Sequence, residues 1–154
     1  MFTPWPIGFV SSPYKEGSDI PKGLGARHEA EGIITILPDF ELGLTDIDGF
    51  SHLIVLWEFD RVQHFELLGT PPADNRQHGV FATRSPLRPN PIGLTVVELL
   101  RRENADLHVR GVDMVDGTPI LDIKPYLSNI PGVSLRRGWL GEAEARENGK
   151  AAVS

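Results

Sequence analysis

Two arginines and one asparagine lie in a proline-rich segment that runs from Gly79 to Gly93. Arg84, Arg88 and Asn90 alternate there with prolines at positions 86, 89 and 91. Each proline fixes φ and lacks a backbone donor, so three of them in six residues exclude a helix or a central strand. They also restrict the residues before them to extended conformations. The segment is therefore predicted to be a stiff loop, either a plain connector or a binding loop that holds two guanidinium groups and an amide at fixed spacing.

A second polar cluster follows later in the chain. It consists of Asp-Gly-Thr-Pro at 116–119 and Asp-Ile-Lys-Pro-Tyr at 122–126, with Asp113 just before. The first of these predicts a tight turn that offers backbone amides and a carboxylate to the polar end or the ribose of a small ligand. In the simpler interpretation Asp116 only makes the turn and Lys124 is a solvated strand end. Two rigid polar clusters in one small chain favour a ligand site.

Other kinds of site find less support in the sequence. The five histidines show no zinc-ligand spacing, and the chain contains no Cys. Asp113, Asp116 and Asp122 could hold Mg²⁺ in principle, but turn and cap roles explain them better. Ser85 lies outside any Gly-x-Ser-x-Gly motif, and the Gly-Leu-Gly at 23–25 lacks the third glycine of a dinucleotide motif. We expect no metal site.

The elements that must position these clusters are short and mostly β. The chain has 16 glycines and 13 prolines, which punctuate apolar or alternating runs. The runs predict strands at 6–10, 30–37, 53–59, 94–100, 107–112 and 120–126, and 80–82 reads as the end of another strand. A turn is expected at 101–106, a short helix capped by Asp39 at 39–44, and a helix from Leu135 that frays from Gly149.

Length and composition indicate one globular domain. The chain has 154 residues, of which 40% are hydrophobic, and a formal charge of −6. This net charge argues mildly against a general nucleic-acid coat protein. The acidic residues are concentrated in the first half, since residues 1–78 contain 5 Lys and Arg against 12 Asp and Glu. No apolar run reaches the length of a membrane span, and the N-terminus has no secretory signal pattern, so we expect a cytoplasmic protein without a membrane partner.

The motifs together resemble the TrmO family, also called YaeB or TsaA-like. The matching segments are 79–86, 88–93, 116–119 and 122–126, with shorter matches at 6–8, 12–15 and 50–53. The resemblance implies a mainly β fold: a small antiparallel β-barrel with a few short helices rather than a Rossmann sheet, over residues 1–135. Residues 136–154 are expected to form a C-terminal helix and tail that are no separate domain. This chain is expected to be a short form, because longer members have an additional C-terminal domain.

The resemblance also implies S-adenosylmethionine as cofactor, bound near the interface of a homodimer. The implied reaction is N-methylation of N6-threonylcarbamoyladenosine beside the tRNA anticodon. Carried over by motif, the cofactor contacts are Gly23, Leu24, Asp60, Arg61, Arg84, Leu94, Asp116, Gly117, Thr118 and Pro119. Longer members usually have His-Gln where this chain has Asp60 and Arg61, and they carry a basic segment where it has residues 68–74.

Methyl transfer from a sulfonium is an in-line displacement that depends chiefly on positioning, and a base could help to remove the acceptor's proton. We expect Arg88 and Asn90 to contact the acceptor. Asp122, Lys124 and Tyr126 are the predicted catalytic residues on the acceptor side. The acidic charge and the short chain leave two alternatives open: a methyltransferase acting on a small molecule, and a non-catalytic S-adenosylmethionine-binding module.

Overall fold

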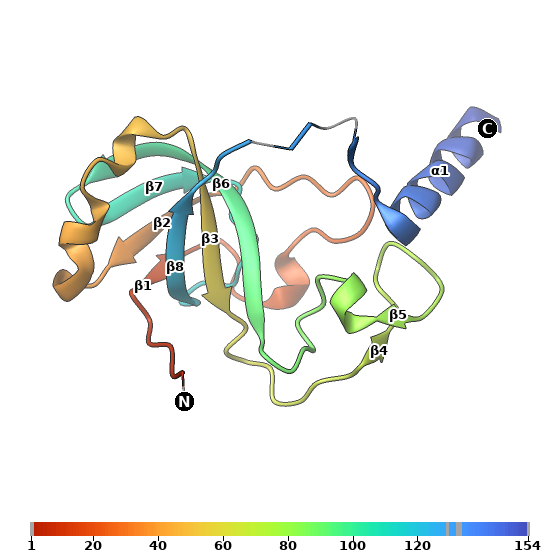
Figure 1. Cartoon of the computed structure of the whole chain (residues 1–154), viewed down its shortest axis with the longest axis horizontal. Helices are drawn as coiled ribbons and strands as arrows, with labels where there is room; N and C mark the ends of the chain where they lie inside the picture. Colours follow the sequence, from red (N-terminus) through yellow and green to blue (C-terminus); the bar gives the residue numbers. More distant parts are fainter. Residues whose placement is uncertain (1, 129, 132–133, 154) are drawn as a thin grey trace.

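The protein, described here by a computed structural model over residues 2–128, 130–131 and 134–153, is built around a closed antiparallel barrel (Figure 1). Six strands form the barrel in the order β1–β2–β7–β6–β3–β8. They are β1 (Gly8–Ser11), β2 (Glu31–Ile36), β3 (His52–Glu58), β6 (Ile92–Glu103), β7 (Asp106–Arg110) and β8 (Pro119–Pro125). The barrel confirms the fold class that the sequence predicts.

The remaining elements lie in the connections and at the C-terminal end. Within the long connection from β3 to β6, β4 (Leu68–Gly69) and β5 (His78–Gly79) pair as a two-stranded ribbon. The described chain also has four 3-10 helices: η1 (Gly17–Asp19), η2 (Pro38–Leu44), η3 (Ile47–Gly49) and η4 (Val80–Ala82). Helix α1 (Gly138–Val153) lies on the side of the β4–β5 ribbon (Figure 1). Among the described helices, none combines the length and apolarity that crossing a membrane requires.

Alternation along the strands fills the barrel interior. In β3 the side chains of Leu53, Val55 and Trp57 are buried, and those between them are half-exposed or exposed. Because successive side chains of a strand point to opposite faces, this pattern gives one face to the core and the other to the outside. Val112 and Met114, which follow β7, are fully buried and complete the core.

Trp57 is accommodated inside the barrel by a missing side chain on the neighbouring strand. Its partner in the β3–β6 register is Gly93, where an added Cβ would lie 2.3 Å from Trp57 Cε2. The indole Nε1–H donates to Thr95 Oγ1 at 3.0 Å, so its polar atom is satisfied in the core. The ring also lies against Phe59, with 4.3 Å between centroids. The glycine that ends the proline-rich segment is therefore a packing requirement.

Two predictions for short segments are wrong. Residues 80–82 form the 3-10 helix η4 and do not end a strand. Helix η2 begins at Pro38, and its N-cap is Leu37 without a side-chain hydrogen bond, so Asp39 does not cap it. A proline at the first helical position already has its φ set for a helix and needs no partner for a missing N–H.

Two predicted boundaries also shift. Strand β6 continues through Glu103, and the turn to β7 contains only Asn104 and Ala105. Asn104 adopts a φ of 55°, a left-handed conformation that asparagine tolerates better than most residues. Helix α1 begins at Gly138 and continues to Val153, past the point where the sequence predicts fraying.

We predict that Gly93→Ala destabilises the fold by about 1–3 kcal/mol, because the new methyl group overlaps the Trp57 ring inside a packed core. Gly79→Ala is the matched control: its φ of −59° and ψ of 139° suit alanine, and an added Cβ there meets no atom within 4 Å. Urea unfolding monitored by tryptophan fluorescence measures both. Equal midpoints for the two variants would contradict the proposed packing.

Candidate functional site

The turn before β8 is hydrogen-bonded to the segment around the end of β1. Asp116 N donates to Tyr14 O at 2.7 Å, and Gly117 N donates to Val10 O at 2.8 Å. Gly117 has a φ of 84°, in the left-handed region that favours glycine. The predicted turn is therefore present, and β1 fixes its place on the barrel.

The backbone amides of this turn are not available to a ligand. Besides those of Asp116 and Gly117, the N–H of Thr118 donates to Val115 O at 3.1 Å. The Thr118 hydroxyl donates to the same carbonyl at 2.6 Å, and Pro119 has no N–H. The prediction that this turn offers amides to a ligand is wrong, because the barrel itself uses them. The group of this turn that can still bind a ligand is the Asp116 carboxylate.

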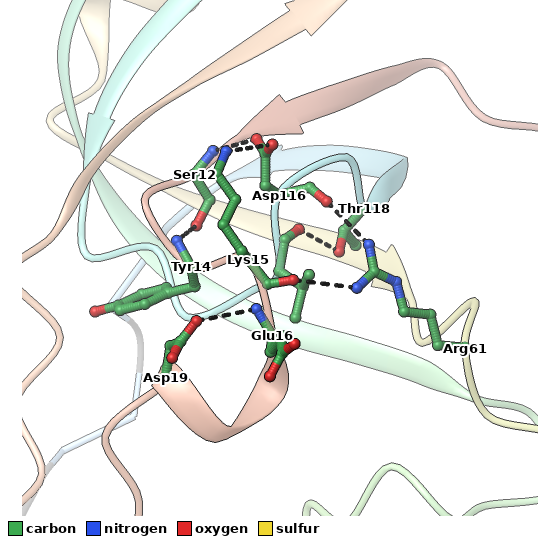
Figure 2. A network of polar contacts seen from close by, with 9 residues as sticks. Ser12, Tyr14, Lys15, Glu16, Asp19, Arg61, Asp116 and Thr118 are labelled. Atoms are coloured by element: carbon green, nitrogen blue, oxygen red, sulfur yellow. Dashed lines mark hydrogen bonds and ion pairs between the residues drawn. The ribbon is translucent and has the colours of Figure 1, made fainter.

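The Asp116 carboxylate is held by two donors from the loop after β1 (Figure 2). Ser12 N donates to Oδ1 at 2.9 Å, and Lys15 Nζ donates to Oδ2 at 2.8 Å. The hydrogen bond from Lys15, then that from Ser12, lowers the pKa of Asp116 below its usual value. The carboxylate is therefore ionised at neutral pH and held in a fixed position while remaining partly exposed.

Arg61 joins the end of β3 to this cluster. Its Nη1 donates to Lys15 O at 3.4 Å and its Nη2 to Asp116 O at 3.3 Å, as Figure 2 shows. The guanidinium charge also contributes to lowering the pKa of Asp116. Two predicted cofactor positions that are 55 residues apart in the chain are thus brought into contact. Asp60, beside Arg61, is exposed.

Ser12, Tyr14 and Lys15 are parts of this site to which the sequence reasoning assigned no role. Tyr14 N donates to Ser12 Oγ at 3.0 Å, which shapes the loop that carries Lys15. The next turn, η1, is closed by Glu16 N donating to Asp19 Oδ2 at 3.1 Å. The Ser-Pro-Tyr-Lys motif at 12–15 was the signal that could have identified these residues, since it belongs to the resemblance.

The proline-rich loop is irregular, as predicted, but its second arginine is used differently from the expectation. Arg88 Nη1 donates to Thr83 O at 2.9 Å and to Ser85 O at 3.1 Å, so this guanidinium bridges its own loop. Ser85 N donates to Thr83 Oγ1 at 3.2 Å and stiffens the same turn. Asn90 is exposed, and its carbonyl accepts from Ile92 N at 2.8 Å. Contact of Arg88 and Asn90 with an acceptor stays a prediction.

Arg84 lies near a half-buried polar group that the sequence analysis left unused. Thr95 Oγ1 donates to Asp113 Oδ1 at 2.5 Å, which extends the hydrogen bond from Trp57. Burial raises the pKa of Asp113, while the Thr95 hydrogen bond and the charges of His28 and Arg84 oppose that rise. His28 Nδ1 is buried without a hydrogen-bond partner. The sequence places Asp113 in the second polar cluster, but no motif predicts its hydrogen bond with Thr95 or its position near His28.

The predicted catalytic residues lie on the outer wall of the barrel. The strand registers place Leu94, Leu56 and Asp122 in one row across β6, β3 and β8. Asp122 Oδ2 pairs with Lys124 Nζ at 2.9 Å, and Tyr126 lies just past the end of β8 with 46% of its surface exposed. The structure gives none of these side chains a hydrogen bond to Asp116 or Arg61, so their catalytic role stays a prediction.

Among the described residues, no hydrogen bond joins Gly23 or Leu24 to Asp116, Lys15 or Arg61. Gly23 has a φ of 84°, and a Cβ added there would have Pro72 O, at 3.8 Å, as its nearest neighbour. Gly23 and Leu24 thus lie toward the β4–β5 connection. Within the described residues, no three His, Asp or Glu side chains are grouped to hold a metal ion.

Comparison with known proteins places this geometry in a family. The family model described as the tRNA-methyltransferase O N-terminal domain matches residues 9–131. A probable S-adenosyl-L-methionine-binding protein of Pyrococcus abyssi is 44% identical over 151 residues, which cover 94% of this chain and 82% of that protein. The tRNA (adenine(37)-N6)-methyltransferase of Escherichia coli is 38% identical over 131 residues, 79% of this chain and 56% of the enzyme.

A solved structure shows the same fold. The crystal structure of TrmO from Pseudomonas aeruginosa superposes with a TM-score of 0.72 and 33% identity, over 90% of this chain and 62% of that one. The chain thus spans a little over half of the relatives that are named tRNA methyltransferase in E. coli and TrmO in P. aeruginosa. The family match over most of the chain and the shared barrel together show that it belongs to the family of the tRNA-methyltransferase O N-terminal domain.

Proposed function

We propose that this chain is an S-adenosylmethionine-dependent methyltransferase that modifies an adenosine of tRNA. The observation that carries the proposal is the contact between Arg61 and Asp116, two cofactor positions carried over by motif and held together by a direct hydrogen bond. The family match and the names of the relatives support it, since these include S-adenosyl-L-methionine-binding proteins and tRNA (adenine(37)-N6)-methyltransferases.

The side chains of the cluster suit the chemistry of the cofactor. S-adenosylmethionine carries a carboxylate, an ammonium group and a ribose diol. A guanidinium such as that of Arg61 binds carboxylates through charge-assisted hydrogen bonds. The Asp116 carboxylate suits an ammonium or the two ribose hydroxyls, and the half-exposed Leu94 offers apolar surface to adenine. When bound, the cofactor supplies an electrophilic methyl group.

The residues of this chain contribute positioning. Lys15 and Ser12 keep Asp116 ionised and in place, so it does not have to be ordered when the ligand arrives. The bonds that Arg88 makes within the proline-rich loop hold that loop in one shape, and Arg84 on the same loop is exposed. Orientation of this kind supplies much of the acceleration of an in-line displacement.

For the acceptor, we propose N6-threonylcarbamoyladenosine beside the tRNA anticodon. Its threonyl carboxylate fits an arginine, and Arg84 is exposed and makes no hydrogen bond or ion pair with any described residue. Asp122, Lys124 and Tyr126 are proposed to line the acceptor side. A tRNA acceptor makes the cytoplasm the expected compartment.

A homodimer is part of this proposal. On the outer face of β6, Ile92, Leu94 and Val96 are 45%, 44% and 41% exposed, which is a continuous apolar row. Covering such a row with the same row of a second copy would remove apolar surface from water. Because Leu94 is a predicted cofactor contact, the cofactor would then lie near the interface.

A methyltransferase for a small molecule or a non-catalytic S-adenosylmethionine-binding module is the second candidate. Several relatives, among them proteins of Pyrococcus abyssi and Archaeoglobus fulgidus, are named only as S-adenosyl-L-methionine-binding proteins. The formal charge of −6 also fits a small acceptor better than a long polyanion.

We predict that the purified protein binds S-adenosylmethionine in a calorimetric titration and that Arg61→Ala weakens the affinity at least tenfold. That loss corresponds to one charge-assisted hydrogen bond of about 1.5–3 kcal/mol. Arg102→Ala is the matched control, because Arg102 donates to Asn104 O and Leu44 O beside the turn from β6 to β7. Unchanged affinity in Arg61→Ala would remove that residue from the cofactor site.

We also predict that a strain without this gene lacks N-methylated N6-threonylcarbamoyladenosine in its tRNA and regains it when the gene is restored. Mass spectrometry of digested tRNA measures the nucleoside, and the unmethylated form serves as an internal control because it should accumulate. An unchanged nucleoside profile together with cofactor binding would leave only the second candidate.

A further inference from the structure

Helix α1 lies beyond the residues that the family model matches, yet it is held in place by specific contacts. The Trp139 ring stacks on His78, with 4.5 Å between centroids and 14° between planes. Its Nε1–H donates to Ala82 O at 2.7 Å. Farther along the helix, Arg146 Nη2 pairs with Asp74 Oδ1 at 2.6 Å. We call these five residues the Trp139 clasp; they join α1 to the segment that runs into the proline-rich loop. Figure 1 shows α1 on the side of the β4–β5 ribbon.

The charges inside the clasp are balanced. The Asp74 side chain is only 2% exposed, and it accepts from His78 Nε2 at 2.7 Å as well as from Arg146. These partners, His78 first, lower the pKa of Asp74, so the carboxylate is ionised. Arg137, directly before the helix, pairs with Glu144 on it. The clasp therefore leaves no charge of its own for a partner.

Four arginines outside the clasp have no hydrogen-bond or ion-pair partner among the described residues. Arg27, Arg76, Arg84 and Arg136 are exposed and make no hydrogen bond or ion pair with any described residue, whereas every other arginine of the chain makes at least one. Arg76 lies between the clasp residues Asp74 and His78. Arg84 follows Ala82 by two residues, and Arg136 precedes Trp139 by three.

Three of these arginines, Arg76, Arg84 and Arg136, therefore lie within three residues of a clasp residue, on segments that the clasp joins. Arg27 lies four residues after Gly23, where an added Cβ would have Pro72 O as its neighbour. On α1, Glu142, one helical turn after Trp139, makes no ion pair with any described residue. Three arginines at the clasp against one such acid give a locally basic surface on a protein whose net charge is −6.

We propose that Arg76, between the clasp residues Asp74 and His78, and Arg136, three residues before Trp139, bind the phosphate backbone of an RNA strand whose path continues to Arg84. Guanidinium groups match phosphate oxygens in shape and charge. They are also weakly hydrated, so an exposed arginine gives up little when it exchanges water for a phosphate. Two arginines from separate segments, fixed relative to each other by the clasp, define a path for a strand. The inference deepens the proposed function by assigning the surface that holds the strand carrying the acceptor base.

The test is the salt dependence of RNA binding. An unmodified anticodon stem-loop transcript with a fluorescent label is titrated with the full-length protein at several salt concentrations, and binding is followed by anisotropy. We expect the double variant Arg76→Gln/Arg136→Gln to reduce the slope of log K against log salt by about 1.4–1.8, which corresponds to two lost phosphate contacts. Affinity at 0.1 M salt should fall at least about tenfold.

The matched control is Arg101→Gln/Arg110→Gln, which removes the same charge from arginines paired with Glu103, Glu98 and Glu31 on β6 and β7. Its slope should equal that of the wild type. Equal slopes for the two double variants, or no RNA binding by the wild type, would overturn the inference. Calorimetry with S-adenosylmethionine separates the two proposals: cofactor affinity should be unchanged in Arg76→Gln/Arg136→Gln, and a protein that binds RNA without binding cofactor would refute the proposed function alone.

Discussion

The closure of the barrel between β1 and β8 is the constraint on which the site depends. Only two residue pairs form that register, Gly8 with Ile120 and Phe9 with Pro119. The seam is extended by Val10, which donates to Thr118 O and accepts from Gly117 N. A closed barrel leaves no strand edge unpaired, so these bonds stabilise the whole sheet. They also lock the turn at 116–118 against the loop that carries Lys15. The same bonds therefore close the fold, consume the turn's amides and fix the Asp116 carboxylate.

The strands could be predicted from the sequence because each has one face in the core and one outside. In β3, the buried Leu53, Val55 and Trp57 alternate with more exposed residues. Residues 80–82 are equally apolar but lie in a 3-10 turn, since a run of three gives too little periodicity to distinguish the two. The role of Gly93 could not be predicted from the sequence either. No neighbouring residue indicates that the indole of Trp57, 36 residues earlier in the chain, occupies the space where a side chain at position 93 would lie.

The parts of the candidate site that could be predicted are those that depend on local conformation. The Asp-Gly sequence predicted the turn correctly, but whether an amide is free depends on partners such as Val10 and Tyr14, about a hundred residues away. Arg88 shows the same limit. Its spacing from the prolines suggested an outward guanidinium, whereas in the structure Arg88 Nη1 donates to the carbonyls of Thr83 and Ser85 in its own loop. Contact between Arg61 and Asp116 depends on register between strands, and only the family resemblance anticipated that both belong to one site.

Net charge is a poor guide to what a protein of this kind binds, and the arrangement of ion pairs explains why. At physiological ionic strength charges are screened over about 8 Å, so an approaching strand responds to the groups nearest to it rather than to the sum of −6. On the barrel, arginines such as Arg101 and Arg110 are already neutralised by glutamates. At the clasp the arginines that flank Trp139 are not. Three of the four described arginines without a hydrogen bond or ion pair, Arg76, Arg84 and Arg136, thus lie within three residues of a clasp residue. This local excess of unpaired arginines, and not the net charge, is the basis on which we propose that a polyanion binds there.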